Sequence, residues 1–246
     1  MFSARTTQSG KLKALFEVLF SNTQDVILTI SKVGIETELT TINNSIICVG
    51  LPAEGFDSYE YSYDEPMYVG LGSHVNNFFK SMKNKTPVTL SITHPYKLDV
   101  KIQCDEDCSL DYSVSFVCAQ NISLSQTYDY DLSKCFMIPT TMFNSMCKSF
   151  SKTDNINILK NSGQLMFSSE LSGISSKVLT VGQKDTTQKP YSKKFKSDSF
   201  VRIGKLSSFA SKPIKIHVEV DKPLMILAES TLGIVKVTMS NDDIEF

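Results

Sequence analysis

Two stretches of the chain follow one pattern: residues 12–39 read LKALFEVLFSNTQDVILTISKVGIETEL, and residues 139–171 read PTTMFNSMCKSFSKTDNINILKNSGQLMFSSEL. Each stretch begins with apolar residues at the helical spacing i, i+3, i+4 and i+7. A polar joint then leads into a strand-like run, a turn that contains glycine and a second strand-like run. The same order of elements therefore occurs twice, which indicates an internal duplication.

A second unit is also repeated. Residues 69–80 (VGLGSHVNNFFK) precede an alternating run at 87–92, and residues 201–212 (VRIGKLSSFASK) precede an alternating run at 213–220. Both alternating runs begin with proline, and each unit predicts a short helix that leads into a strand.

The two duplicated units predict two copies of one domain. We expect an N-terminal domain at residues 1–119 and a C-terminal domain at 132–246, each with two helices and many short strands. Residues 120–131 are polar and predict an interdomain linker. Short turns between strands favour antiparallel sheets with the helices on one face, an α+β fold.

Exposed edge strands require a partner, and the chain offers two candidates. Residues 111–118 end the first copy, and residues 175–182 lie in the second. Pairing of these edges between subunits would close a ring. The interface residues that we expect on them are Tyr112, Val114, Phe116, Lys177 and Leu179.

The bulk composition is that of an ordinary globular protein, with 41% hydrophobic and 21% charged residues. No apolar run approaches the roughly 18–20 residues that span a bilayer. The first ten residues lack an apolar signal core, so we expect neither secretion nor a membrane partner. Six cysteines are then expected as reduced, mostly buried thiols.

The net charge is −1, but the cations have a marked bias: only Arg5 and Arg202 among 25 basic residues are arginine. Arginine reads guanine edges with two hydrogen bonds, whereas lysine acts as a point charge on phosphate. The bias favours contact with DNA that does not depend on sequence. An AT-rich genome that favours lysine codons explains it equally well.

Four segments resemble the sliding DNA clamps of the proliferating cell nuclear antigen (PCNA) family. They are the opening Met1-Phe2-x-Ala4-Arg5-x-x-Gln8, Glu54-Gly-Phe-Asp-Ser-Tyr59, Asp111-Tyr112 and Leu206-x-x-Phe209. The resemblance covers nearly the whole chain in register. It implies a homotrimeric ring of six clamp domains whose helices line the hole around duplex DNA.

Such a clamp is a processivity factor without catalytic activity or cofactor. The resemblance implies that it is placed on DNA by a clamp loader and tethers DNA polymerase and other replication and repair proteins. It also implies a nuclear location, or a viral replication compartment if the source is viral. The alternatives are a clamp paralogue in checkpoint or repair, and a transcription accessory factor that does not tether clients.

A clamp that slides needs weak, exchangeable phosphate contacts, which lysines on the exposed helix faces provide. The residues predicted to face DNA are Lys11, Lys13, Lys80, Lys83, Lys148, Lys152, Lys205 and Lys212. Ordinary solvated helix faces are the alternative reading. Ala14, Phe20 and Ser145 stand where the family commonly has cations, which predicts a thinner cationic lining.

Clients of such clamps bind through a short peptide that enters an apolar pocket beside the linker. The residues predicted to form this pocket are Thr40, Asn44, Ile46, Ile47, Ile122, Leu124, Pro223 and Met239. Thr40 and Asn44 replace the methionine and histidine usual in the family. Strand alternation brings only one of Ile46 and Ile47 to the surface.

No sequence motif predicts catalysis. His74, His94 and His217 are scattered, and Cys104-x-x-x-Cys108 lacks a third and fourth zinc ligand at matching spacing, which favours a turn with incidental thiols. Residues 183–196 form a basic stretch that predicts a DNA contact on one rim, a nuclear localisation signal or a solvated loop.

Overall fold

The computed structural model describes residues 1–94, 96–103, 108–118, 128–150, 155–171, 175–182 and 190–240. The elements of the first half are β1 (Phe2–Thr6), α1 (Ser9–Asn22), β2 (Asp25–Ser31), β3 (Gly34–Thr40), β4 (Ile46–Pro52), β5 (Ser58–Tyr61), β6 (Met67–Gly72), α2 (Val75–Ser81), β7 (Val88–Ile92), β8 (Lys97–Gln103), β9 (Ser109–Ser115) and β10 (Val117–Cys118).

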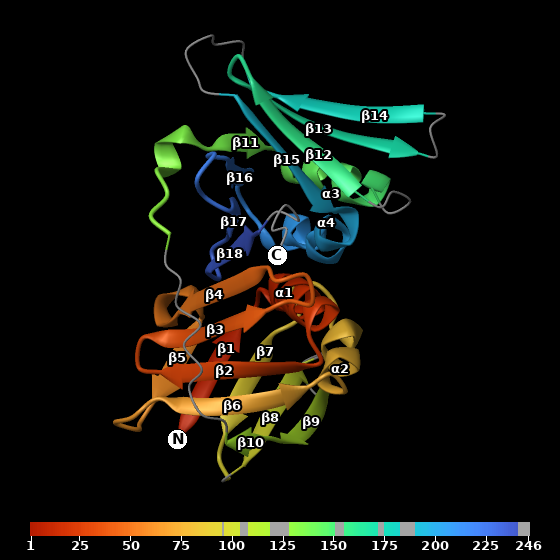
Figure 1. Cartoon of the computed structure of the whole chain (residues 1–246). Coiled ribbons are helices and arrows are strands. Elements are labelled where there is room, and N and C mark those ends of the chain that lie inside the picture. The colour runs from red at the N-terminus through yellow and green to blue at the C-terminus, as the bar shows by residue number, and fades with distance from the viewer. Residues whose placement is uncertain are drawn as a thin grey trace.

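The second half follows the described end of the linker. Its elements are β11 (Phe136–Ile138), α3 (Thr140–Ser149), β12 (Asn155–Asn161), β13 (Gln164–Leu171), β14 (Ser175–Val181), β15 (Tyr191–Lys196), α4 (Ser197–Ile203), α5 (Leu206–Phe209), β16 (Ile214–His217), β17 (Leu224–Glu229) and β18 (Ile234–Met239). Figure 1 shows the two halves one above the other.

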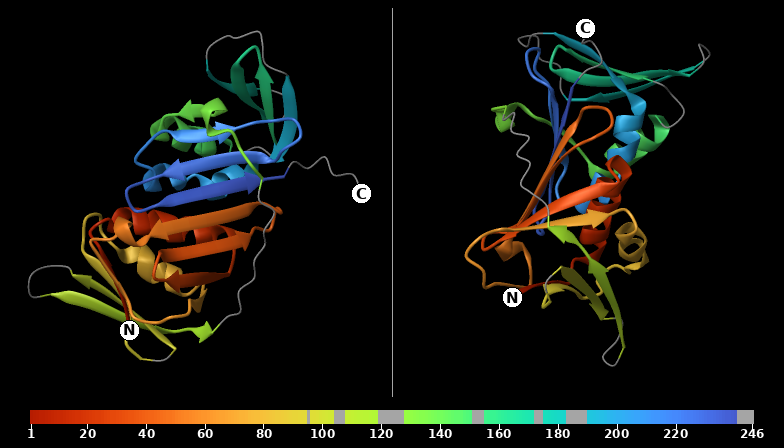
Figure 2. Two further views of the ribbon diagram at one scale, coloured as in Figure 1. Left: turned by 90° about the vertical axis from the view of Figure 1, so that its left-hand side faces the viewer. Right: turned by 60° about the horizontal axis from the view of Figure 1, so that its bottom comes forward.

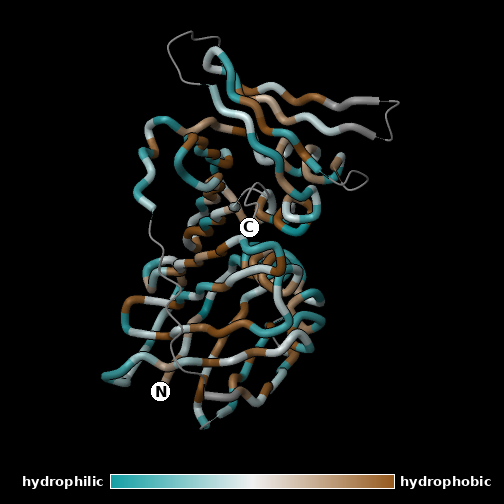
Figure 3. Tube along the Cα trace, in the orientation of Figure 1, coloured by the Kyte–Doolittle hydropathy of each residue, from teal (hydrophilic) through white to brown (hydrophobic). Residues whose placement is uncertain are grey.

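The strands form three antiparallel sheets with the orders β5-β1-β7-β8-β9, β10-β6-β2-β3-β4-β18-β17-β16-β11 and β14-β13-β12-β15. Apolar and polar residues alternate along many of the strands (Figure 3), so one face of each such strand is buried. The predicted α+β class with antiparallel sheets is confirmed.

The pairing order confirms the duplication. Each half contains two runs of four paired strands. The run β6-β2-β3-β4 of the first half corresponds to β15-β12-β13-β14 of the second. The run β1-β7-β8-β9 corresponds to β11-β16-β17-β18. Helix α1 precedes β2 as α3 precedes β12, and α2 precedes β7 as α4 and α5 precede β16. Strand β4 therefore corresponds to β14, and β9 corresponds to β18.

One strand pair joins the two halves. Strand β4 lies antiparallel to β18, with Cα partners that run from Ile46↔Thr238 to Gly50↔Ile234. The side chains of Ile47, Val235 and Val237 are fully buried along this joint. Figure 2 shows the orange β4 beside the blue strands of the second half in one continuous sheet.

Both predicted edges are edge strands: β9 ends the five-stranded sheet and β14 ends the four-stranded one. The first stretch was predicted too long, because the chain leaves the edge after Ser115 and Val117 pairs with Gly70 of β6. Phe116 is buried between these strands, at 6% exposure, so it does not lie on the free edge as predicted.

Two helical predictions also need correction. Residues 69–72 continue strand β6, and the helix there begins only at Val75. The fourth helix is divided into α4 and α5 around Gly204, where a Cβ atom would lie 3.2 Å from Cβ of Cys147 in α3. Close packing against α3 and the low helix propensity of glycine both favour the break there.

The apolar stripe predicted for α1 is confirmed, because Leu12, Leu15, Phe16 and Leu19 are almost fully buried. The Phe16 ring stacks on Phe79 of α2 with centroids 3.7 Å apart. In α3, however, Met142 is 40% exposed although it was predicted within the apolar stripe. It lies beside the free edge of β14, where no described residue covers it.

The joint requires glycine at position 233. Gly233 has φ +153°, and a Cβ atom there would lie 2.2 Å from the carbonyl oxygen of Gly50. We expect Gly233→Ala to lower the free energy of unfolding by about 2 kcal/mol or more, since the left-handed backbone and the clash are both unfavourable. Urea denaturation measures the change.

Gly50→Ala is the matched control, because a Cβ atom at Gly50 meets nothing within 4 Å. Its unfolding free energy should stay within about 0.5 kcal/mol of the parent protein. Equal unfolding midpoints for the two variants would contradict the close approach at the joint.

Candidate nucleic-acid interface

The helices of both halves form one continuous row. Helix α1 packs on α2 at one side and on α4 and α5 at the other, and α3 packs on α4 and α5 in turn. The row therefore runs α2, α1, α4 with α5, α3, and Figure 1 shows it along one side of the sheets. Elements predicted from separate stretches of sequence thus share one surface.

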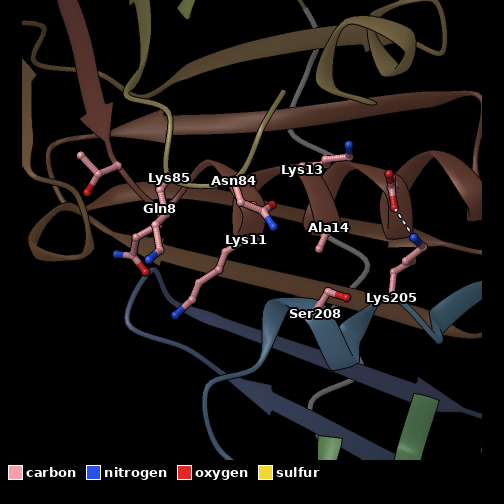
Figure 4. A pocket seen from close by; sticks show the side chains of 11 residues that line it. Gln8, Lys11, Lys13, Ala14, Asn84, Lys85, Lys205 and Ser208 are labelled. Carbon is pink, nitrogen blue, oxygen red and sulfur yellow. Dashed lines mark ion pairs between the residues drawn. The ribbon is translucent and has the colours of Figure 1, made fainter. Parts of the chain in front are cut away.

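An open depression lies in this row between α1 and α5. Its lining includes four lysines and one carboxylate: Lys11, Lys13, Lys85, Lys205 and Glu17. Figure 4 shows these side chains around the exposed side of α1. The excess of ammonium groups favours a polyanion over an apolar ligand.

Lys11 links the two halves. Its Nζ donates hydrogen bonds to the hydroxyls of Ser211 and Thr231, the latter at 2.9 Å. The Thr231 hydroxyl in turn donates to the side-chain oxygen of Gln8. Partial burial lowers the pKa of Lys11, and its ammonium is committed to the joint as well as to the depression.

Lys13 holds the end of α2. Its Nζ donates to the carbonyl oxygens of Lys80 at 2.5 Å and Met82 at 3.3 Å. The last carbonyls of a helix have no partner within the helix, and a lysine satisfies them well. This predicted DNA contact therefore also has a structural task that the sequence did not indicate.

An ion pair joins the halves across the depression. Lys205 Nζ lies 3.1 Å from Glu17 Oε2, the pair drawn with a dashed line in Figure 4. Arg202 of α4 pairs with Asp198 and donates to the carbonyl of Ser21 in α1. These contacts fix the relative position of the helices, and each side chain remains partly exposed.

The other predicted DNA-facing lysines occupy different surroundings. Lys80, Lys83 and Lys148 are exposed on the helix row or at its ends. Lys212 lies 3.4 Å from Glu229, which Lys215 also contacts at 3.0 Å. Lys152 falls outside the described residues. Lys85 lines the depression and was missed, because it lies in a turn where no helical pattern singles it out.

The departures from the family pattern are explained only in part. Ala14 is 2% exposed on the floor of the depression, so its side chain presents almost no surface. Phe20 is half-buried and stacks near Phe16 with centroids 6.1 Å apart. Ser145 is exposed, so Lys148 is the only cation that α3 carries.

Part of the predicted client pocket comes together at one end of the central sheet. Thr40 pairs with Ile46, and Ile46 pairs with Thr238, so these residues form a row across three strands. Pro223 precedes β17, and its carbonyl accepts a hydrogen bond from the Tyr130 hydroxyl at 3.3 Å. Asn44, with φ +53°, forms the adjacent turn.

The remaining pocket residues lie elsewhere. Ile47 is fully buried and Met239 is 1% exposed, so neither presents surface, whereas Ile46 is partly exposed, as strand alternation predicted. Ile122 and Leu124 fall outside the described residues. Ile42, at 78% exposure, is an apolar residue in the same turn that the sequence pattern did not single out.

Four of the five predicted subunit-interface residues lie on the edge strands β9 and β14, and Phe116 is the exception. Tyr112 of β9 is half-buried because Phe78 of α2 stacks on it with centroids 4.5 Å apart, and Val114 is buried beneath the strand. In β14, Leu179 lines an apolar groove beside α3, and Lys177 pairs with Ser169. Each free edge is thus accompanied by a helix with apolar side chains.

Among the described residues no group of three His, Cys, Asp or Glu side chains is placed to hold a metal ion. His74 and His94 are exposed and His217 is buried, while Cys108 is exposed and Cys104 lies outside the described part of the chain. None of the helices that the structure describes is long and apolar enough to cross a bilayer.

The sequence matches no protein-family model and no curated protein. The function is therefore inferred from the helix row and from the edge strands β9 and β14.

The hydrogen bonds from Lys13 to the end of α2, called here the Lys13 tether, can be tested by substitution. We expect Lys13→Ala to destabilise the protein by about 1 kcal/mol, because the carbonyls at the end of α2 lose their donor. Hydrogen exchange should accelerate in α2 and little elsewhere. Lys80→Ala is the control, since it removes an equal charge nearby and keeps the backbone acceptor; equal exchange in the two variants would rule the tether out.

Proposed function

We propose that this chain is one protomer of a ring-forming sliding DNA clamp. Three copies would encircle duplex DNA and tether a polymerase and other replication or repair proteins, after loading by a clamp loader. The observation that carries the proposal is the β4–β18 joint, because the chain also presents the counterparts of those two strands as unpaired edges.

The internal duplication supports assembly through these edges. Strand β14 corresponds to β4 and strand β9 corresponds to β18, so pairing of β14 with β9 of another copy would repeat the joint that already exists within the chain. A head-to-tail contact of this kind forms a closed ring when the rotation between copies allows closure, and an open filament otherwise. Closure after three copies is implied by the resemblance to the PCNA family.

The duplication also supplies a register for that contact. The prolines before β7 and β16 and the two-residue turns after β2 and β12 align the copies. Within the chain, Val237 lies opposite Ile47, and the corresponding pair between copies would be Tyr112 opposite Lys177. Likewise Val235 lies opposite Val49, and the corresponding pair between copies would be Leu110 opposite Leu179. Leu110, 47% exposed in one chain, would be covered by an apolar partner.

The flanking helices fit the same arrangement. Across the β4–β18 joint, α1 packs against α4 and α5. The corresponding neighbours at a joint between chains are α3 and α2. The groove beside β14 is lined by Met142, Met146, Phe150 and Leu179, and the half-exposed Phe78 stands beside β9. An aromatic side chain and an apolar groove are complementary surfaces.

The helix row supports the DNA-facing assignment. Its lysines offer point charges on one side of the sheets, and only Arg202 among the residues of the row is arginine. Contacts of this type neutralise phosphates and read no bases, which permits sliding. Because Lys11, Lys13 and Lys205 also hold the fold together, the readily available cations are fewer, and binding should be strongly salt-sensitive.

Client binding involves a different surface from the DNA contacts. The end of the central sheet at Thr40, Ile46 and Pro223 is a partly exposed surface next to the described end of the linker. We infer that clients dock here through apolar side chains, with the exposed Ile42 as an additional contact.

Association through the free edges can be measured as a mass. The parent protein should form a species of three times the chain mass of 27.4 kDa in light scattering at micromolar concentration. Leu110→Asp should shift it to the monomer, because a carboxylate would be buried at the joint without a partner. Val33→Asp, at a residue 69% exposed in the β2–β3 turn, is the control. A parent protein that remains monomeric at this concentration would contradict the proposed ring.

Clamp activity is tested by polymerase extension on primed circular DNA. We expect longer products with the chain and a loader than without them. Lys80→Ala, Lys83→Ala and Lys85→Ala together should weaken DNA association. The logarithm of the DNA association constant falls linearly with the logarithm of the salt concentration. The three substitutions should make this slope less steep by about 0.9 for each phosphate that the variant no longer neutralises.

The matched control removes three exposed lysines that lie outside the helix row, one in the β2–β3 turn and two on strands: Lys32→Ala, Lys97→Ala and Lys194→Ala. This variant should behave as the parent. A trimer that never stimulates a polymerase would favour the checkpoint or transcription alternatives, whereas equal effects of the two triple variants would contradict the helix row as the DNA surface.

A further inference from the structure

The duplicated halves differ at one end of their cores. In the first half, Ile30 and Val69 are buried apolar residues, at 1% and 0% exposure. The pairings β2–β6 and β12–β15 place Lys160 and Lys193 at the corresponding positions of the second half. The copy that carries isoleucine and valine shows that the fold itself does not require lysine there.

The two lysines lie together on the inner face of the sheet. Lys160 is directly opposite Tyr191, and Lys193 is opposite the buried Ile158, so all three side chains share the face on which Phe195 is buried. Residues in diagonal positions on neighbouring strands approach closely enough for long side chains to interact. Lys160 Nζ lies 5.9 Å from the centre of the Phe136 ring, and Lys193 Nζ lies 5.5 Å from that of Tyr191.

The ammonium groups of Lys160 and Lys193 form no ion pair with a described carboxylate. No described carboxylate lies within salt-bridge distance of Lys160 or Lys193, and Lys193 makes only a long bond of 3.5 Å to the carbonyl of Lys222. The Tyr191 side chain is 3% exposed, and its hydroxyl has no hydrogen-bond partner among the described residues. A buried hydroxyl without a partner is unfavourable, which marks a place where a bound group would satisfy it.

Two described acids of this neighbourhood already have lysine partners. Glu219 pairs with Lys222 at 2.9 Å, and Asp131 pairs with Lys134 at 3.0 Å. Burial lowers the pKa of Lys160, against the opposing effect of Glu219, and burial raises the pKa of Tyr191. The phenol therefore stays protonated and can donate, while an anion beside Lys160 would favour its charged form.

The strand that carries these groups has an open edge. Among the described residues β15 pairs only with β12, whereas its counterpart β6 pairs with both β2 and β10. In the first half Cys118 of β10 lies opposite Val69. A peptide strand added to β15 in the same way would place a residue opposite Lys193, with its side chain on the same face as Lys193.

The start of this edge lies on the side of the second half opposite the helices, whereas β15 ends where α4 begins. In Figure 1 the start of β15 and the neighbouring β11 are on the left of the second half, and α3 and α4 are on the right. The described end of the linker lies close by, since Lys222 also donates to the carbonyl of Asp129 at 2.7 Å.

We propose that the β15 edge binds an extended acidic peptide of a partner protein, whose oxyanion is held by Lys160, Lys193 and the Tyr191 hydroxyl. Backbone hydrogen bonds to β15 supply the docking, and the three donors select a carboxylate or a phosphorylated side chain. The site does not depend on clamp activity and can be tested without DNA.

The test uses two synthetic hexapeptides, one alternating valine with glutamate and one alternating valine with phosphoserine, in calorimetric titrations with the full chain. Lys160→Ile combined with Lys193→Val restores the residues of the first half. We expect this variant to melt at or above the parent temperature, because partly buried ammonium groups are replaced by apolar side chains. Its peptide affinity should fall at least tenfold.

Lys194→Ala combined with Lys196→Ala is the control, because these exposed residues alternate with Lys193 on β15 and carry the same charge. It should bind as the parent does, and Tyr191→Phe should bind less tightly. The tighter of the two peptides identifies the oxyanion. The proposal fails if neither peptide binds, or if the control loses affinity as the Lys160 and Lys193 variant does. It also fails if binding appears only after residues 241–246 are deleted, since the acidic end of the chain itself would then be the occupant.

Discussion

The antiparallel pairing of β4 with β18 is the interaction on which the rest of this structure depends. It joins two duplicated halves into one nine-stranded sheet and aligns their helices as a single row. The contacts of Lys11, Glu17 and Arg202 reinforce it from the helix side. Without this pairing the depression between α1 and α5 would not exist, because its lysines come from both halves.

The first half contributes β4 to this pairing, and the second half contributes β18. The counterpart of β18 in the first half is β9, and the counterpart of β4 in the second half is β14. Both counterparts are edge strands, so they form two unlike ends of the chain. A body with complementary ends associates head to tail, and whether it forms a ring or a filament depends on the angle between copies. The exposed Leu110 and Val178 and the groove around Met142 show that these ends are apolar. Exposed apolar edges of this kind favour association, which is consistent with the proposed contact between copies.

Much of this architecture follows from periodicity in the sequence. The stripes of α1 and α3, the paired strands after them and the two edges were all predicted, because burial of one face dictates spacing. The Lys13 tether, the break at Gly204 and the turn that brings Lys85 to the depression were not, since they depend on contacts between distant residues. Exposure of Met142 was mispredicted for a related reason: its pattern fits a buried stripe, and only the fold shows that nothing described covers it.

Internal duplication also provides a control within the molecule, because two copies of one fold reveal which residues the fold needs. Isoleucine and valine at positions 30 and 69 close the first core, while lysines at 160 and 193 leave the second with ammonium groups and an unsatisfied phenol. Packing alone favours the apolar pair, since burying an unpaired charge is unfavourable. The second half therefore retains groups that stability would remove, which is the pattern expected where binding opposes stability. If the chain forms the ring proposed above, this edge would recur once per copy, and a partner with several acidic segments would gain affinity from simultaneous contacts.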